Sequence, residues 1–316
     1  MPARIERKTR EALAKRAHFS AILPLSEAYE PDLNGLVHKV QRIVAPSGAK
    51  VLLHPEMRKL EKAETGGLLG FGAKPTETRM IFLVIDHVGV WIAARQGPLE
   101  HYGALGRWAN PEVWPEGLTS LSNHAAWVEI CDLGFMRDRG VERLDRAFNR
   151  AAAVTAAMAA VAASSKGVGL LWHPARNALP IESFVDQVEQ VILGRAPLDL
   201  WMRWFYVQPE DPALKAGVIT RGLLPFVGHE VEVRPSQLAP EEAVELTYEF
   251  ARMLIDRGTE PRTGMIVAPG RNLRATVRVG ESSTREGLPV FELSVEPGRE
   301  GAPARSGRPS GAAAGE

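Results

Sequence analysis

The fold of this chain is decided by the stretch from His124 to Pro174. It opens with the apolar run His124-Ala-Ala-Trp-Val-Glu-Ile-Cys131 and continues through an alanine-rich segment, Val141 to Ser165. It ends with a second apolar run, Val168-Gly-Leu-Leu-Trp-His-Pro174. Short apolar runs favour buried strands, whereas a long segment with apolar residues at helical spacing favours a helix. The stretch therefore predicts a strand, a helix and a second strand.

The expected central helix is apolar on nearly all of its surface. One stripe at helical spacing consists of Leu144, Phe148, Ala151, Thr155, Met158 and Ala162. Alanines make up much of the remaining surface, which allows neighbouring elements to approach closely. A helix of this kind is normally buried on more than one side. We expect burial between layers of the same chain, with an oligomer interface as the alternative.

Length and charge exclude several classes of protein. The chain has 316 residues, of which 45% are hydrophobic, so it can bury a large core. Its 38 basic and 38 acidic residues cancel. This balance gives no electrostatic case for binding nucleic acid or an anionic membrane surface. We therefore expect neither partner.

Cysteine content and the N-terminus indicate a cytoplasmic protein. The single cysteine, Cys131, lies in an apolar run, which predicts a buried and unreactive thiol in a reducing compartment. The basic segment 1–17 is not followed by the apolar stretch of a secretory signal. The apolar run Ala151 to Ala163 is shorter than the roughly 17 residues that a membrane-spanning helix needs.

The order of the expected elements indicates an α+β protein with mixed, largely antiparallel sheets packed with helices. We divide it into a basic N-terminal arm (1–17), an N-terminal α+β half (18–123), a C-terminal α+β half (124–296) and a disordered tail (297–316). Both halves start with a strand and a helix and then return to strands. This echo suggests a duplicated strand-helix-strand plan.

Alternation and helical spacing place the elements within each half. In the N-terminal half we expect a helix after Pro31 and strands at 19–25, 50–54, 80–86 and 88–95. In the C-terminal half we expect helices at 180–194 and 240–256, and strands at 198–207, 217–220, 229–234, 265–268, 273–279 and 290–295.

Two long connections interrupt the N-terminal half. The first, 57–78, contains Gly66-Gly-Leu-Leu-Gly-Phe-Gly-Ala-Lys74, but Pro75 follows where a phosphate-binding loop continues into a helix. We expect a mobile loop there. The second, 97–123, carries Trp108 and Trp114, which we expect to pack the loop onto the core, with a pocket lining as the alternative.

From about residue 80 to 296 the chain resembles a bacterial family known as domain of unknown function 4261. The likeness is carried by His124–Ile130, Gly169–Pro174, Leu179–Phe184, Thr220–Val233 and Thr263–Val267. These motifs are structural rather than chemical. The resemblance implies a fold and a bacterial cytosolic setting, and it brings no activity.

No motif in the sequence indicates a catalytic centre or a cofactor. The pair Glu230 and Glu232 falls on one face of an expected strand, where we interpret it as solvated rather than as a cation site. No zinc-binding or nucleophile-elbow spacing occurs, so we expect no metal. Ser164-Ser165-Lys166 is more simply the end of the alanine helix.

The best candidate for ligand binding is the loop Trp172-His173-Pro-Ala-Arg176-Asn177. It follows an expected strand and precedes a helix, a position where ligands often bind. His173 has the chemistry of an acid or base, Arg176 that of an anion binder, and His124 lies on a neighbouring expected strand. The alternative is a loop whose side chains hydrogen-bond to the backbone.

Three hypotheses remain for the function. The leading one is a non-catalytic module that binds another protein, as an accessory or immunity-type factor does. The second is a ligand-binding protein or enzyme that uses the His173/Arg176 loop. The third is a structural unit that self-assembles as a homo-oligomer through the alanine-rich helix.

Overall fold

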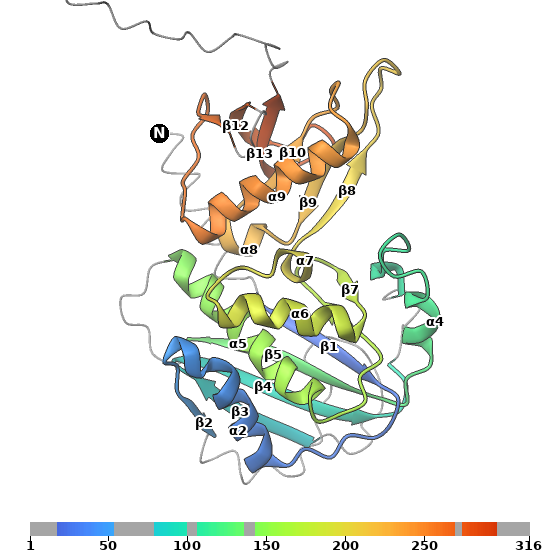
Figure 1. Ribbon diagram of the computed structural model, residues 1–316, viewed down its shortest axis with the longest axis vertical. Helices are drawn as coiled ribbons and strands as arrows, with labels where there is room; N and C mark the ends of the chain where they lie inside the picture. The colour runs from blue at the N-terminus through green and yellow to red at the C-terminus, as the bar shows by residue number, and fades with distance from the viewer. Residues whose placement is uncertain (1–17, 54–78, 100–105, 136–142, 269–273, 296–316) are drawn as a thin grey trace, which may run out of the picture.

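The computed structural model describes residues 18–53, 79–99, 106–135, 143–268 and 274–295. It is an α+β structure with two sheets that lie one above the other in Figure 1. The expected N-terminal arm, the glycine-containing loop 57–78 and the C-terminal tail 297–316 lie outside the described residues. The fold class expected from the sequence is confirmed.

The first sheet has seven strands in the order β2-β3-β4-β5-β1-β6-β7. The strands are β1 (Ser20–Leu25), β2 (Val51–Leu53), β3 (Arg79–Ile85), β4 (Val88–Gln96), β5 (Ala126–Phe135), β6 (Leu170–Trp172) and β7 (Asn177–Leu179). All neighbouring pairs are antiparallel. The central strand β1 is buried along its whole length, between β5 and β6.

Three helices pack on one face of this sheet: α2 (Leu33–Val44), α5 (Arg143–Ala162) and α6 (Ile181–Ile192). The alanine-rich helix α5 contacts β1, β4 and β5 below it and α2 and α6 beside it. Alanines along it are buried by this chain's own elements, as expected for a helix between layers. The surface that the self-assembly hypothesis assigned to an oligomer interface is therefore largely covered within one chain.

The opposite face of the first sheet is covered in part by the segment that contains η3 (Gly106–Trp108) and α4 (Gly117–Ser122). Trp114 of this segment is buried with Ile22, Trp127 and Leu171 of the sheet. The expectation that its aromatic residues pack the connection onto the core is confirmed for Trp114.

The second sheet has six strands in the order β11-β12-β13-β10-β9-β8. The strands are β8 (Arg203–Val207), β9 (Gly217–Arg221), β10 (Glu230–Val233), β11 (Ile266–Val267), β12 (Ala275–Glu281) and β13 (Pro289–Val295). One pair, β10 with β13, is parallel and the others are antiparallel. The helix α9 (Pro240–Asp256) covers one face, and the short helix α8 (Leu224–Val227) connects β9 to β10.

A cluster of aromatic side chains joins the two sheets into one core. Trp172 of β6 stacks on Trp201, with ring centroids 6.2 Å apart, and Trp201 stacks on Phe226 of α8 at 5.1 Å. Phe19, just before β1, lies 5.1 Å from Phe226. Aromatic pairs at these separations are favourable beyond the area that they bury. The two sheets therefore share a continuous apolar interior.

The expected strand 198–207 is wrong in its first half. The structure has a helical turn, α7 (Leu198–Trp201), followed by β8. Pro197 sets the start of the turn and Asp199 lies in its first turn, where acidic residues are favourable. The turn places Trp201 at 0% exposure in the aromatic cluster, a position that a straight strand would not give.

The remaining differences concern boundaries. The expected division between halves at residues 123 and 124 falls inside the first sheet, because β5 pairs with β1 on one side and β4 on the other. The change from one sheet to the other falls between β7 and β8. In the part of the chain that the structure describes, no helix has the length and apolarity needed to cross a membrane.

Candidate functional site

The structure separates His124 from the other residues predicted for the ligand site. His124 is buried, its Nδ1 lies 2.6 Å from the carbonyl oxygen of Leu121, and its Nε2 accepts a hydrogen bond from the backbone N–H of Leu99 at 2.6 Å. It thus ties the two ends of the 97–123 connection together. Its strand begins opposite Leu25, whereas Trp172 pairs with Ala21. Four residues of β1 separate these positions by about 13 Å.

Trp172 and Asn177 serve the fold. Trp172 is 1% exposed and belongs to the aromatic cluster. The side-chain amide of Asn177 donates to the carbonyl oxygens of Asp199, at 2.6 Å, and Leu200, at 3.4 Å. These hydrogen bonds fix β7 against α7. Both side chains were predicted to bind a ligand, but in the structure they are buried and make contacts within the fold.

His173 and Arg176 lie in a tight turn between β6 and β7. The backbone N–H of Arg176 donates to the carbonyl oxygen of His173 at 3.0 Å, and Arg176 adopts a positive φ of 49°. The His173 ring stands edge-on to Trp108 with centroids 4.9 Å apart. Its Nε2 is buried and has no hydrogen-bond partner in the described part of the chain. Burial, followed by the charge of Arg176, lowers the pKa of His173 to about 4.

Two arginines of the second sheet meet this turn. Arg203 of β8 and Arg221 of β9 are directly opposite each other in the antiparallel register. The Nη1 of Arg203 donates to the carbonyl oxygens of Trp108 at 2.8 Å and Arg176 at 3.1 Å. Arg203 thereby connects the second sheet to both η3 and the β6–β7 turn. Like charges placed directly opposite in a sheet are destabilising, so this pair has a cost.

A fourth arginine comes from the turn between β12 and β13. Arg285 lies over the ring of Phe205, 5.3 Å from its centroid, and Arg203 lies over the same ring at 4.9 Å. Burial is the largest cause that lowers the pKa of Arg221 below its usual value. Positive charge from Arg176, Arg285 and Arg203 lowers it further. We call Arg176, Arg203, Arg221 and Arg285 the arginine site.

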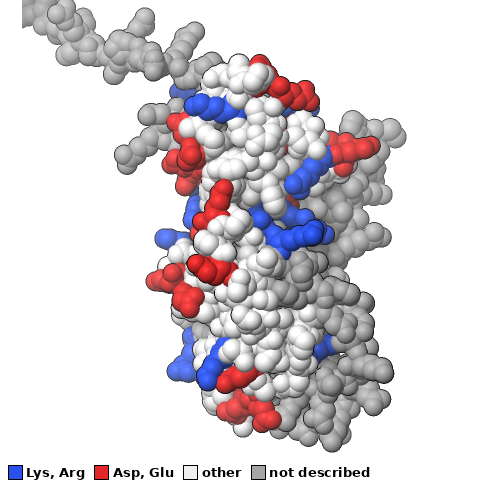
Figure 2. All heavy atoms as spheres, turned by 90° about the vertical axis from the view of Figure 1, so that its right-hand side faces the viewer, with Lys and Arg blue, Asp and Glu red and all other residues white. Residues whose placement is uncertain are grey.

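Among the described residues, no carboxylate forms an ion pair with an arginine of this site. The ion pairs among described residues involve other arginines, a lysine and a histidine. Arg176 and Arg285 are exposed, while Arg203 and Arg221 are partly buried. Figure 2 shows Lys and Arg side chains gathered at mid-height, the level at which the two sheets meet. The site is thus a positively charged region open to solvent.

Glu230, the acidic residue whose charge acts on Arg221, binds backbone amides instead. Its carboxylate accepts hydrogen bonds from the Thr220 hydroxyl at 2.8 Å and from the amides of Gly222, Leu223 and Leu224 at 2.9 to 3.1 Å. Burial raises the pKa of Glu230, against the effect of these four donors. Glu230 therefore stabilises the turn from β9 into α8.

The interpretation of Glu230 and Glu232 as a solvated pair is wrong, because both are buried. Glu232 accepts hydrogen bonds from the Ser283 hydroxyl at 2.5 Å and its amide at 3.3 Å, which hold the β12–β13 turn over the sheet. Among the residues that the structure covers, no group of three or more His, Cys, Asp or Glu is placed to hold a metal ion. Cys131 is buried as expected, and burial, followed by Glu129, raises the pKa of its thiol.

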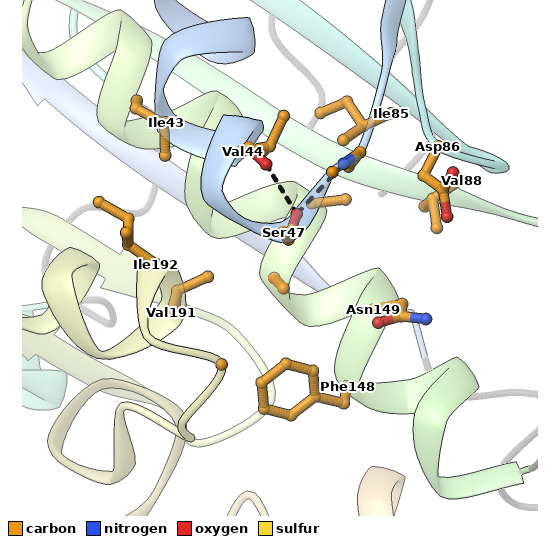
Figure 3. A pocket seen from close by; sticks show the side chains of 15 residues that line it. Ile43, Val44, Ser47, Ile85, Asp86, Val88, Phe148, Asn149, Val191 and Ile192 are labelled. Carbon is orange, nitrogen blue, oxygen red and sulfur yellow. Dashed lines mark hydrogen bonds between the residues drawn. The ribbon is translucent and has the colours of Figure 1, made fainter.

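A separate cavity of about 340 Å³ lies between the end of α2, helix α5 and the end of α6 (Figure 3). Its polar side chains are Ser47, Asp86 and Asn149, and Ser47 hydrogen-bonds to its own backbone neighbours. Ligand sites normally add several converging polar groups to an apolar lining. The arginine site gathers four groups of one charge, which this cavity does not. The lining includes Ile43, Val44, Ile85, Val88, Phe148, Val191 and Ile192.

Comparison with family models, with curated proteins and with solved structures gives no match for this chain. The resemblance to domain of unknown function 4261 stays a prediction.

Of the four arginines of the site, the sequence singled out Arg176, together with the neighbouring His173, and it missed Arg203, Arg221 and Arg285. The missed residues come from three separate segments of the second sheet. Their one shared signal is the register that places Arg203 opposite Arg221. Strand register of this kind is not readable from a single sequence when the start of the strand is itself misplaced.

Proposed function

We propose that this chain is a non-catalytic binding protein that holds an anionic group of its partner at the arginine site. The observation that supports this most strongly is the cross-strand pair Arg203 and Arg221, with which no carboxylate of the described chain forms an ion pair. A bound anion converts the repulsion of this pair into charge-assisted hydrogen bonds. The partner we favour is another protein, as for an accessory or immunity-type factor.

Two groups with the chemistry of a base or a nucleophile, His173 beside the arginine site and Cys131 in β5, favour binding over catalysis. A general base near neutral pH needs a pKa close to the working pH, and the pKa of His173 is lowered to about 4. The Cys131 thiol is held protonated by its raised pKa. Neither group has the properties of an activated base or nucleophile. The arginines supply affinity and orientation for an anion without supplying a reacting group.

Calorimetric titration of the purified chain with simple anions at constant ionic strength tests this proposal. We expect heat of binding with sulfate or phosphate, reduced at least about tenfold in affinity by Arg221→Gln and by Arg285→Gln. Arg195→Gln, at an exposed arginine after α6, is the matched control and should bind as the wild type does. Equal weak binding by all four proteins would contradict the proposal.

Protein partners are tested by capture from the lysate of the source cell with the wild type and with Arg221→Gln in parallel. A partner that is retained by the wild type and by Arg195→Gln, but lost by Arg221→Gln, supports docking at the arginine site. A partner retained equally by all three would place the docking surface elsewhere and contradict the proposal.

A further inference from the structure

We infer that the anion taken by the arginine site is a phosphate monoester dianion rather than a carboxylate. This inference rests on the proposed function, because it names the ligand class of the same site. It starts from the number of donors that the four guanidinium groups leave for a ligand.

The donors of the four arginines divide into used and available ones. The Nη1 of Arg203 is occupied by three backbone carbonyls, those of Arg107, Trp108 and Arg176. Its Nε is buried and has no hydrogen-bond partner among described residues. No hydrogen bond or ion pair of the described chain engages the guanidinium groups of Arg176, Arg221 and Arg285. The guanidinium groups of Arg176, Arg221 and Arg285 therefore remain available to bind a ligand, whereas that of Arg203 is held in place by backbone carbonyls.

The charge and shape of a phosphate monoester suit this set of donors. A guanidinium presents its N–H groups in a fixed fork that binds two oxygens side by side. A carboxylate has two oxygens and one charge, which one or two forks satisfy. A phosphate monoester has three terminal oxygens and a charge of about −1.5 to −2 at neutral pH. It satisfies three forks at once and offsets more of the repulsion between Arg203 and Arg221.

The arrangement of the forks also suits a group that projects from a larger molecule. Arg176 and Arg285 are exposed and come from two turns, β6–β7 of the first sheet and β12–β13 of the second. Arg203 and Arg221 are partly buried. A phosphate on a short stem reaches the partly buried pair while the exposed pair contacts its remaining oxygens. Arg203 and Arg285 both lie over the ring of Phe205, which gives the arginine site an apolar surface.

The first test compares phenyl phosphate, inorganic phosphate, sulfate, acetate and succinate by calorimetry at pH 7.5 and constant ionic strength. We expect phenyl phosphate, phosphate and sulfate to bind at least about tenfold more tightly than either carboxylate. Arg176→Gln, Arg221→Gln and Arg285→Gln should each remove most of this preference, and Arg195→Gln should keep it. Arg285→Gln changes an exposed turn and is the variant least at risk of misfolding.

The outcomes separate this inference from the proposed function. If a carboxylate binds as tightly as phosphate and Arg221→Gln abolishes both, the anion site stands and the phosphate assignment is overturned. If no anion binds the wild type, the proposed function fails as well. Binding of phosphate that is equal in the wild type and all three arginine variants overturns both.

A second measurement uses the charge of the ligand itself. Between pH 7.5 and pH 5.5 phosphate loses most of its second charge, while sulfate keeps both. Titration of the neighbouring His173 or Glu230 affects the two ligands alike, so the ratio of their affinities isolates the ligand charge. We expect the phosphate-to-sulfate affinity ratio to fall about fivefold on acidification. An unchanged ratio contradicts recognition of the dianion.

The source of the phosphate is separated by two further ligands, a phosphoserine peptide and adenosine monophosphate, each compared with inorganic phosphate. A peptide that binds at least about tenfold more tightly than inorganic phosphate, while the nucleotide does not, indicates a phosphorylated protein partner. The reverse order indicates a small phosphorylated ligand. If both bind more weakly than inorganic phosphate, the site does not accept a monoester and the inference is overturned.

Discussion

Two pairs of arginines lie on the same face of the second sheet and differ in one respect. Arg234 and Arg278 lie on either side of Glu292, whose carboxylate pairs with both. Arg203 and Arg221 face each other with no carboxylate between them. The first pair shares an ion-paired carboxylate, whereas the second has no ion pair among the described residues and only the charge of the buried Glu230 acts on Arg221. This difference is what our proposal explains, in which an anion from outside offsets a repulsion that otherwise lowers stability.

The largest expected effect concerns Glu230, the acidic residue whose charge acts on Arg221. Glu230→Ala should lower the free energy of unfolding by about 3 kcal/mol or more, because four donors lose their acceptor. Urea denaturation measures this, with the exposed Glu245→Ala as control. A loss below about 1 kcal/mol would mean that Glu230 is free to neutralise Arg221, and the comparison between the two pairs would break.

The next largest effect concerns His173 and the dependence of the free energy of unfolding on pH. Because the pKa of His173 is lowered from 6.5 to about 4, the unfolded chain binds a proton in this window that the folded chain does not. Stability should therefore fall as the pH drops from 6.5 to 4, by about 2 kcal/mol more than in His173→Gln. Denaturation at several pH values measures the difference, with His87→Gln, at the exposed β3–β4 turn, as control. Parallel curves for the wild type and His173→Gln would contradict it.

Glu292 should show the behaviour of the neutralised pair. Burial alone would raise the pKa of Glu292, but hydrogen bonds and charge from Arg278 and Arg234 hold it below its usual value. Its contribution to stability is therefore present above about pH 4.5 and lost as the pH falls through the folded pKa. Glu292→Gln should lower the free energy of unfolding by about 2 kcal/mol at pH 7. It should also reduce the acid limb, by which we mean the loss of stability as the pH falls below about 4.5.

The acid limb is measured by urea denaturation between pH 2.5 and 6, about the range in which carboxylates titrate. Glu281→Gln, at the exposed end of β12, is the control and should retain the wild-type slope. If Glu292→Gln keeps the same slope as well, the pair Arg234 and Arg278 is not neutralised as described.

The smallest effect has the opposite sign. Arg221→Gln should raise the free energy of unfolding by about 0.5 kcal/mol at low ionic strength, because it removes the repulsion with Arg203. The gain should shrink as salt is added, since salt screens exposed charges. Thermal unfolding without phosphate or sulfate measures it. A loss of stability at low salt would show that Arg221 contributes to the fold rather than to binding.

Elements with strong local signals were predictable from the sequence. Helix α9 begins at Pro240 and ends at Asp256 as expected. Glu241 and Glu242 lie in its first turn, where acidic residues are favourable, and Gly258 adopts a positive φ just after its end. The alanine-rich helix was predicted because its apolar spacing is set locally. Such signals depend on neighbours in sequence, which a single chain displays directly.

The candidate site depends on relations that are not local. His173 and Arg176 were found because they are two residues of one turn, but Arg203 and Arg221 meet them only through strand order and register. The start of β8 was also mispredicted, because Leu198 and Trp201 belong to an aromatic run that is typical of a strand, whereas they form the helical turn α7. Tertiary packing of Trp201 overrides that local preference.

The aromatic cluster of Trp172, Trp201 and Phe226 prevents the two sheets from folding independently of each other. Because these rings lie in one apolar core that residues of both sheets share, neither sheet keeps its interior when the other is removed. Heat should therefore melt the chain in a single calorimetric transition. Proteins whose regions fold separately tolerate being cut or exchanged between relatives. Here a cut between β7 and β8 would expose both surfaces, so the two sheets must be engineered as one unit.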